Sequence, residues 1–152
     1  MQSSQRIEIP IEDADQINDL TTLFVQAGKQ SVYPDFIDEP VLLVSDELKK
    51  LLELYDYHLI SKCTVLADIE EKTQKLYWLL LLNHIDCLSN QSTFDKNGQI
   101  KDIVINGEQA KGKKIFRIQG IKTPLVIINL DVAESILRRN FWGIQLKKLQ
   151  TV

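Results

Sequence analysis

The sequence predicts an α+β fold with one mixed, mainly antiparallel sheet and two to three flanking helices. The first observation is the longest apolar run, residues 76–88, which lies at the centre of the 152-residue chain. It is shorter than the roughly 20 residues needed to cross a bilayer, so we expect it to be buried in a core. Its aromatic residues and the polar segment that follows favour a central strand covered on both faces. A buried helix is the alternative, because Leu is a strong helix former.

The second observation is that short strand patterns alternate with segments of helical spacing, beginning at the N-terminus. Residues 6–11 alternate apolar and polar side chains, and Pro10 favours an edge strand. Asp13 or Asp15 then caps a predicted helix that ends near Gly28. The apolar face of that helix comprises Ile17, Leu20, Phe24 and Ala27. We therefore expect residues 1–40 to form a strand–helix appendage, closed by a loop at 31–40, packed on an α+β domain at 41–152.

The middle of the chain contains the clearest strand–helix–strand pattern. Residues 41–44 form a compact apolar strand, and Ser45 caps a helix that runs to about Asp56. Residues 57–66 form the next strand, and a charged turn at 68–75 leads into the central strand. The apolar stripe of the helix comprises Leu48, Leu51, Leu52 and Tyr55.

The last third predicts further short strands and one more helix. Asn97-Gly98 is a hairpin signal. Asn129 or Asp131 caps the predicted second amphipathic helix. The predicted strands are residues 103–105, 114–118, 124–128 and 142–149.

Composition and charge limit the function classes. Two cysteines without a CxxC pattern, and an N-terminus without an apolar signal region, favour a cytoplasmic protein with free thiols. The net charge is −3, but residues 1–76 hold 7 Lys and Arg against 15 Asp and Glu, and residues 77–152 hold 11 against 6. Either the two halves attract each other within one domain, or an acidic face meets a basic partner.

One cluster offers a catalytic or metal-binding interpretation. His84, Asp86 and Cys87 lie within four residues, and Cys beside His is a nucleophile–base pair. On a strand, however, His84 and Cys87 point to opposite faces, and a metal site needs three or four ligands. A buried, hydrogen-bonded end of the core strand is the favoured interpretation, so we expect no catalytic residue, cofactor or metal.

A small basic run offers a nucleic-acid interpretation. It comprises Lys111, Lys113 and Lys114, with Arg117 nearby. With a sequence pI of about 5.4, a solvated loop is favoured over nucleic-acid binding. The chain contains no phosphate-binding, dinucleotide-binding, zinc-protease or nucleophile-elbow motif.

Four ordered segments carry a family resemblance. They are VSDELKKLL at 44–52, YWLLLLNHIDCLS at 77–89, IFRIQG at 115–120 and WGIQL at 142–146. In this order they resemble a family of small immunity proteins. The genes of that family lie beside genes for polymorphic bacterial toxins, and these toxins are contact-dependent or secreted. The resemblance covers residues 41–149. Ser89, where the family has an acid, and Asn129, where it has Ser, depart from the pattern at positions that look structural.

The resemblance implies a cytoplasmic antidote that is not an enzyme and that binds a cognate toxin domain. It implies no nucleic-acid or membrane partner. Contact residues differ between members of such families, so none can be transferred. A charged turn beside the core strand can be presented rigidly, so Asp68, Glu70 and Glu71 are the candidate toxin-binding residues, against the alternative of a plain solvated turn.

Overall fold

The computed structural model describes residues 6–26, 28 and 32–152. Helices and strands are both present, and the α+β fold class is confirmed. Contacts divide the chain into two compact units. Unit 1 comprises Met1–Leu81 and Ile136–Ile144, and unit 2 comprises Leu82–Ser135 and Gln145–Val152.

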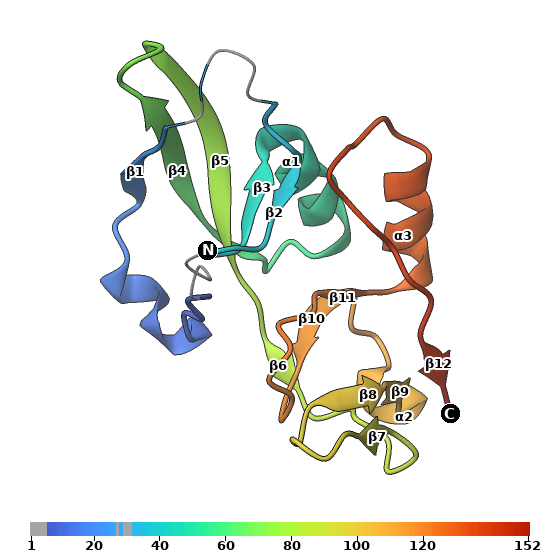
Figure 1. Ribbon diagram of the computed structural model, residues 1–152. Helices are drawn as coiled ribbons and strands as arrows, with labels where there is room; N and C mark the ends of the chain where they lie inside the picture. The colour runs from blue at the N-terminus through green and yellow to red at the C-terminus, as the bar shows by residue number, and fades with distance from the viewer. Residues whose placement is uncertain (1–5, 27, 29–31) are drawn as a thin grey trace. The chain divides into compact units, whose positions relative to one another are not determined.

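Unit 1 contains a five-stranded mixed sheet with the order β1-β4-β5-β3-β2 (Figure 1). β1 runs parallel to β4, and the other neighbouring strands are antiparallel, which agrees with the predicted mixed, mainly antiparallel sheet. The strands are β1 (Leu20–Phe24), β2 (Phe36–Ile37), β3 (Leu43–Ser45), β4 (Ile60–Asp68) and β5 (Thr73–Leu81).

The hairpin of β4 and β5 is the centre of this sheet. Its register runs from Ile60 opposite Leu81 to Asp68 opposite Thr73. β5 contains the first part of the long apolar run, so the prediction of a strand there is confirmed as far as Leu81. The strand begins at Thr73, within the segment expected to be a turn, because pairing with β4 continues to the end of the hairpin.

One face of the sheet holds a buried cluster. Residues two apart on a strand point to the same face, and the register aligns the cluster's members across three strands. They are Leu43, Leu66, Tyr77 and Leu79. The partly buried residues that pack on the cluster all precede β3 in the sequence, and they are Ile9, Ile17, Val25, Tyr33, Ile37 and Val41.

Helix α1 (Asp46–Tyr55) contacts β3 and β5. Ser45 is its N-cap, because the Ser45 Oγ accepts a hydrogen bond from the Leu48 amide at 3.2 Å. Trp78, which alternates with Tyr77 and so points to the opposite face, donates from Nε1 to the Asp46 Oδ1 at 2.9 Å. The Lys49 Nζ lies 4.0 Å from the centroid of the Trp78 ring. α1 therefore covers the β3–β5 side of the face opposite the buried cluster.

The N-terminal predictions are wrong in their secondary structure. Residues 6–10 form no strand, and the predicted helix is replaced by the 3₁₀ helix η1 (Ile11–Gln16) and by β1. The physical reason is that pairing with β4 satisfies backbone groups of this segment, and Thr21 and Thr22 are β-branched residues that favour a strand. Ala27 of the predicted helix face and residues 1–5 lie outside the described part of the chain. A domain boundary at residue 40 stays a prediction, although β1 and β2 belong to the same sheet as β3–β5.

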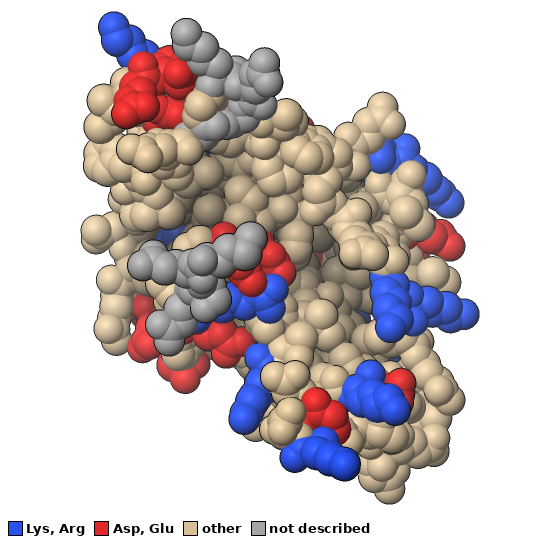
Figure 2. Space-filling view, in the orientation of Figure 1, with Lys and Arg blue, Asp and Glu red and all other residues tan. Residues whose placement is uncertain are grey.

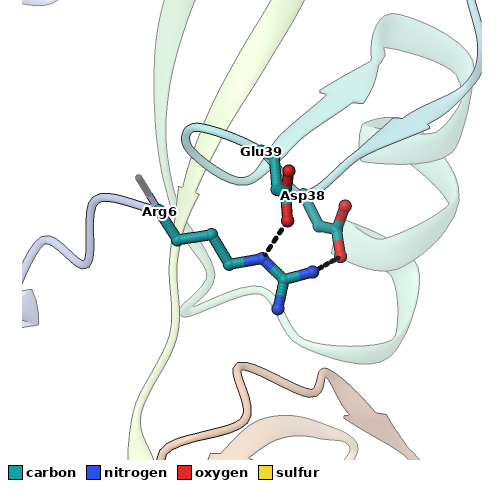
Figure 3. A network of polar contacts seen from close by, with 3 residues as sticks. All are labelled: Arg6, Asp38 and Glu39. Carbon is teal, nitrogen blue, oxygen red and sulfur yellow. Dashed lines mark hydrogen bonds and ion pairs between the residues drawn. The ribbon is translucent and has the colours of Figure 1, made fainter. Parts of the chain in front are cut away.

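Arg6 fixes the start of the described chain to the β2–β3 connection (Figure 3). Its Nε lies 2.7 Å from the Glu39 Oε1, and its Nη2 lies 3.1 Å from the Asp38 Oδ2. The Ile7 amide also donates to the Pro40 carbonyl at 2.6 Å. These contacts hold the segment that leads to Ile9 and the buried cluster.

Unit 2 consists of smaller sheets. β10 pairs with β11 in an antiparallel manner and with β6 in a parallel manner, and β7 and β8 form the hairpin that contains Asn97-Gly98. Its core comprises Cys87, Ile105, Phe116 and Ile118. The elements are β6 (His84–Ile85), β7 (Thr93–Phe94), β8 (Ile100–Asp102), β9 (Val104–Ile105), α2 (Gly107–Ala110), β10 (Ile115–Ile118), β11 (Ile127–Ile128), α3 (Leu130–Leu137) and β12 (Gln150–Thr151).

The C-terminal predictions are partly correct. α3 begins after Asn129, whose Oδ1 accepts from the Val132 amide at 3.1 Å, so the predicted cap is confirmed. The last two residues of α3, Ile136 and Leu137, belong to unit 1. The strand predicted over 142–149 is wrong, because the chain pairs with β9 only at β12. Gly143 interrupts the alternating pattern with a φ of +76°, which a strand does not allow.

Candidate functional site

His84, Asp86 and Cys87 do not form one site. His84 and Asp86 are exposed, and Cys87 is fully buried in the core of unit 2. The expectation that the His and Asp side chains are buried is therefore wrong. β6 is only two residues long, so the chain ends its pairing with β10 before Asp86. Among residues 6–26, 28 and 32–152, no group of three or more His, Cys, Asp or Glu side chains is placed to hold a metal ion.

The thiol of Cys87 is kept in its neutral form. Burial raises the pKa of Cys87, and the negative charge of Asp86 raises it further, while a backbone hydrogen bond partly offsets both effects. A nucleophilic cysteine needs the opposite environment, one that lowers the pKa. Cys87 therefore has the character of a core residue.

The three candidate toxin-binding residues lie at the β4–β5 turn but differ in exposure. Asp68 is only 3% exposed. Its Oδ1 accepts from the Glu71 amide at 3.1 Å and its Oδ2 accepts from the Gly28 amide at 3.2 Å. Glu70 is exposed and Glu71 is half-buried. The Asp68 carboxylate thus holds the turn, and the turn presents Glu70 and Glu71.

The charge asymmetry of the sequence follows the two units. Unit 1 holds 15 Asp and Glu against 9 Lys and Arg, a net charge of −6. Unit 2 holds 6 Asp and Glu against 9 Lys and Arg, a net charge of +3. The excess of acidic residues in the sequence therefore lies in unit 1, and its negative charge creates a negative potential around that unit.

The basic run lies in unit 2. Lys111 and Lys113 are exposed in the turn after α2, and the Lys114 Nζ lies 3.7 Å from the Asp131 Oδ2. Arg117 is a half-buried residue of β10. These cations are spread over a turn, an ion pair and a strand, which supports the solvated-loop interpretation.

Sequence reasoning missed a polar cluster around Asp35 in unit 1. The Asp35 Oδ1 accepts from the Ser45 Oγ at 2.7 Å, and its Oδ2 accepts from the Trp142 amide at 2.9 Å. The Asp35 amide donates to the Trp142 carbonyl at 3.0 Å. A pocket of about 380 Å³ lies beside this cluster, lined by Asp35, Glu47, Arg139, Asn140 and Phe141. The sequence signal for Asp35 is its position between Pro34 and Phe36, in a segment that was predicted to be a loop.

The hydrogen bonds of Asp35 are structural. They tie residues 142–143 to the β2 edge of the sheet and to the Ser45 cap of α1. Both carboxylate oxygens accept donors from the chain itself, so the cluster holds the fold together. Other exposed surfaces of unit 1 include the β4–β5 turn and β1.

Comparison with known proteins identifies the family. The family model of an immunity protein family, Imm11, matches residues 15–151. No curated protein matches the chain. Among the described residues, no helix is long and apolar enough to span a membrane. The matched range includes β1 and ends at the last residue of β12, so it covers elements of both units and confirms the resemblance carried by the four sequence segments. The chain therefore belongs to the immunity protein family (Imm11), which indicates an immunity function.

Proposed function

We propose that this protein neutralises a cognate bacterial toxin domain in the cytoplasm by direct binding and without catalysis. The observation that carries the proposal is the family match over residues 15–151. The separation of exposed His84 and Asp86 from buried Cys87 supports a role in binding. The toxin belongs to the contact-dependent or secreted polymorphic class that the family resemblance implies.

Unit 1 is the part of the chain that binds the toxin. Its net charge of −6 favours a basic partner surface, such as the cleft of a nuclease. Glu70 and Glu71 at the β4–β5 turn are contacts in this proposal, because the Asp68 carboxylate holds their backbone in one conformation. A preformed turn loses little conformational entropy on binding, which favours affinity. Asp68 itself acts by positioning the turn.

Co-expression with the toxin encoded by the adjacent gene tests the proposal. The pair should co-elute as one complex in size-exclusion chromatography, and the immunity protein should restore growth of cells that express the toxin. Two separate peaks together with undiminished toxicity would disprove direct neutralisation.

Titration distinguishes a binder from an enzyme that modifies the toxin. A fixed amount of toxin is mixed with increasing immunity protein, and residual toxin activity is followed with time. A binder reduces the activity in proportion to the amount added, and the residual activity then stays constant. Complete loss of activity at a small fraction of one equivalent, increasing with time, would show turnover and would contradict the proposal.

A further inference from the structure

The outer edge of β1 differs from the opposite edge of the sheet. The order β1-β4-β5-β3-β2 places β1 at one edge and β2 at the other (Figure 1). Beside β2, the Asp35 backbone is paired with Trp142. β1 has β4 on one side, and four of its five residues are exposed. A strand with one unpaired side is a template for another strand.

Among the described residues, no strand pairs with the outer side of β1, and every second residue of β1 directs its backbone groups to that side. The Val25 amide donates to the Ala67 carbonyl of β4 at 2.9 Å. Successive residues of a strand direct their N–H and C=O groups to opposite sides, so Thr21 and Leu23 also face β4. The backbone groups of Thr22 and Phe24 then face away from the sheet. This is the pattern that a further strand needs.

An apolar surface adjoins this edge. Leu20 is 62% exposed and Phe24 is 71% exposed, and both lie on the face that α1 covers farther along the sheet. The register continues this surface to Val65 on β4 and to Leu76 on β5, which is 39% exposed. α1 contacts β3 and β5. On the β1–β4 half of this face, Cys63 and Val65 are half-buried and Ala67 is buried, and the exposed apolar side chains are those of Leu20, Phe24 and Leu76. Exposed apolar surface beside an open strand edge is typical of an interaction site.

Acidic side chains lie at both ends of the edge. Glu12 and Asp15 precede the N-terminal end of β1 and are exposed, and Asp19 beside them is paired with Lys62, whose Nζ lies 2.8 Å from the Asp19 Oδ1. Because β1 is parallel to β4, its C-terminal end lies beside the β4–β5 turn with Glu70 and Glu71. Figure 2 shows uncharged surface over β1, with acidic atoms near η1 and near the β4–β5 turn, where basic atoms also lie. An occupant is therefore favoured if its middle is apolar and its ends are basic.

We propose that the cognate toxin adds an extended segment to the free edge of β1, with apolar side chains over Leu20, Phe24 and Leu76 and with Lys or Arg at the ends of the segment. This inference rests on the proposed function and specifies its interface. Backbone hydrogen bonds along β1 supply affinity, and the apolar and basic side chains select the segment. The binding energy is concentrated at the apolar centre, as in other protein interfaces.

Matched variants of the full chain test this interface against the toxin encoded by the adjacent gene. Leu20→Lys places a cation on the apolar surface, and Thr22→Pro removes an outward N–H while leaving the β4 side of the strand intact. Leu54→Lys is the matched control, because Leu54 is 80% exposed on α1 and lies outside the proposed interface. Each variant should retain the thermal unfolding temperature of the wild type. Leu20→Lys and Thr22→Pro should raise the dissociation constant about tenfold or more, and Leu54→Lys should leave it unchanged.

Two footprints test the interface without a substitution. Amide hydrogen exchange at Thr22 and Phe24 should slow when the toxin binds, because both amides gain partners. Half-buried Cys63, which lies opposite Leu20 on β4, should react more slowly with a maleimide in the complex, and buried Cys87 is the internal reference.

The outcomes separate the inference from the proposed function. Unchanged affinity of Leu20→Lys and Thr22→Pro, with unchanged exchange at Thr22 and Phe24, would overturn the β1 interface while the toxin still binds elsewhere. A wild-type protein that binds no toxin would overturn both. If ultracentrifugation of the protein alone shows a dimer that Leu20→Lys dissociates, the edge belongs to a second copy of this chain and the inference is wrong.

Discussion

Tyr77 shows how one buried polar group joins distant parts of unit 1. Its ring is fully buried in the cluster with Leu43, Leu66 and Leu79, and its hydroxyl donates to the Pro34 carbonyl at 2.6 Å. Asp35, the next residue, accepts from the Ser45 cap and from the Trp142 amide. The Tyr77 hydroxyl therefore satisfies a carbonyl in the segment that holds α1 and residues 142–143.

Tyr77→Phe should lower the free energy of unfolding by about 1 to 2 kcal/mol, because the Pro34 carbonyl loses its donor inside the protein. Chemical denaturation at neutral pH measures the change. Tyr57→Phe is the matched control, since Tyr57 is exposed and should tolerate the substitution. Equal stability of wild type and Tyr77→Phe would show that water replaces the hydroxyl.

Ionisation of Tyr77 should make the free energy of unfolding depend on pH. Burial, with smaller contributions from Asp35 and Tyr33, raises the pKa of Tyr77 to about 12. The unfolded chain has a tyrosine pKa of about 10. Because the folded pKa is the higher one, this stabilisation is fully present below about pH 10 and is lost as the pH rises toward 12. The stability difference between wild type and Tyr77→Phe should therefore shrink across that interval, and a difference that grows with pH would contradict the assignment.

The two cysteines should differ in reactivity. Burial raises the pKa of Cys87, so its thiol is neutral and shielded, whereas Cys63 is half-buried. In the folded protein, iodoacetamide should modify Cys63 first, and both thiols should react in denaturant. Mass spectrometry of the labelled peptides measures the two rates. Faster labelling of Cys87 than of Cys63 in the folded state would indicate a reactive thiol and would support the catalytic interpretation.

At the scale of elements, the predictions succeeded where local chemistry determines the structure. Ser45 and Asn129 have side-chain oxygens that cap helices, and Asn97-Gly98 forms a hairpin turn, so each could be identified without knowledge of distant contacts. The β4–β5 hairpin was similarly predictable from apolar runs on either side of a charged turn.

The prediction failed at β1 because the same apolar residues fit two periods. Leu20 and Phe24 are four apart, which suits a helix, but they are also two apart from Thr22, which suits a strand. The choice depends on pairing with β4, which is about 40 residues away in the sequence. The candidate interface was missed for the same reason, since the helix interpretation placed both residues in the core. The β4–β5 turn could be predicted because its charged residues are neighbours in the sequence, and its role in toxin binding stays a prediction.

A substitution of Gly143 tests how closely the C-terminal segment packs on Pro34, beside the β2 edge of the sheet. Gly143 has a φ of +76°, and a Cβ at this position would collide with the Pro34 side chain. Gly98 has a similar φ of +74° with no atom within 4 Å of an added Cβ. Gly98→Ala should cost about 1 to 2 kcal/mol from backbone strain alone. Gly143→Ala should cost clearly more in thermal or chemical unfolding, because the collision adds to the strain, and equal costs would show that Pro34 moves aside.

At the scale of the whole molecule, charge and apolar surface have separate roles in the proposed complex. Unit 1 carries a net charge of −6, with exposed acids at both ends of β1, and the apolar residues lie between them. Long-range attraction acts before contact and so affects the association rate, whereas the apolar centre acts after contact and affects the dissociation rate. The two contributions can therefore be measured independently on the same complex.

Ionic strength and charge reversal should affect association with the toxin. Between about 0.01 M and about 1 M salt the Debye length falls from roughly 30 Å to roughly 3 Å, so the association rate should fall several-fold while the dissociation rate changes little. Replacing both Glu70 and Glu71 with Lys should reduce the association rate at low salt and flatten its salt dependence. Glu108→Lys, in the positively charged unit 2, is the matched control and should leave the rate nearly unchanged. Stopped-flow or surface-plasmon measurements provide both rates. An association rate that is independent of salt, or an equal effect of Glu108→Lys, would mean that the acidic surface of unit 1 does not guide the toxin to β1.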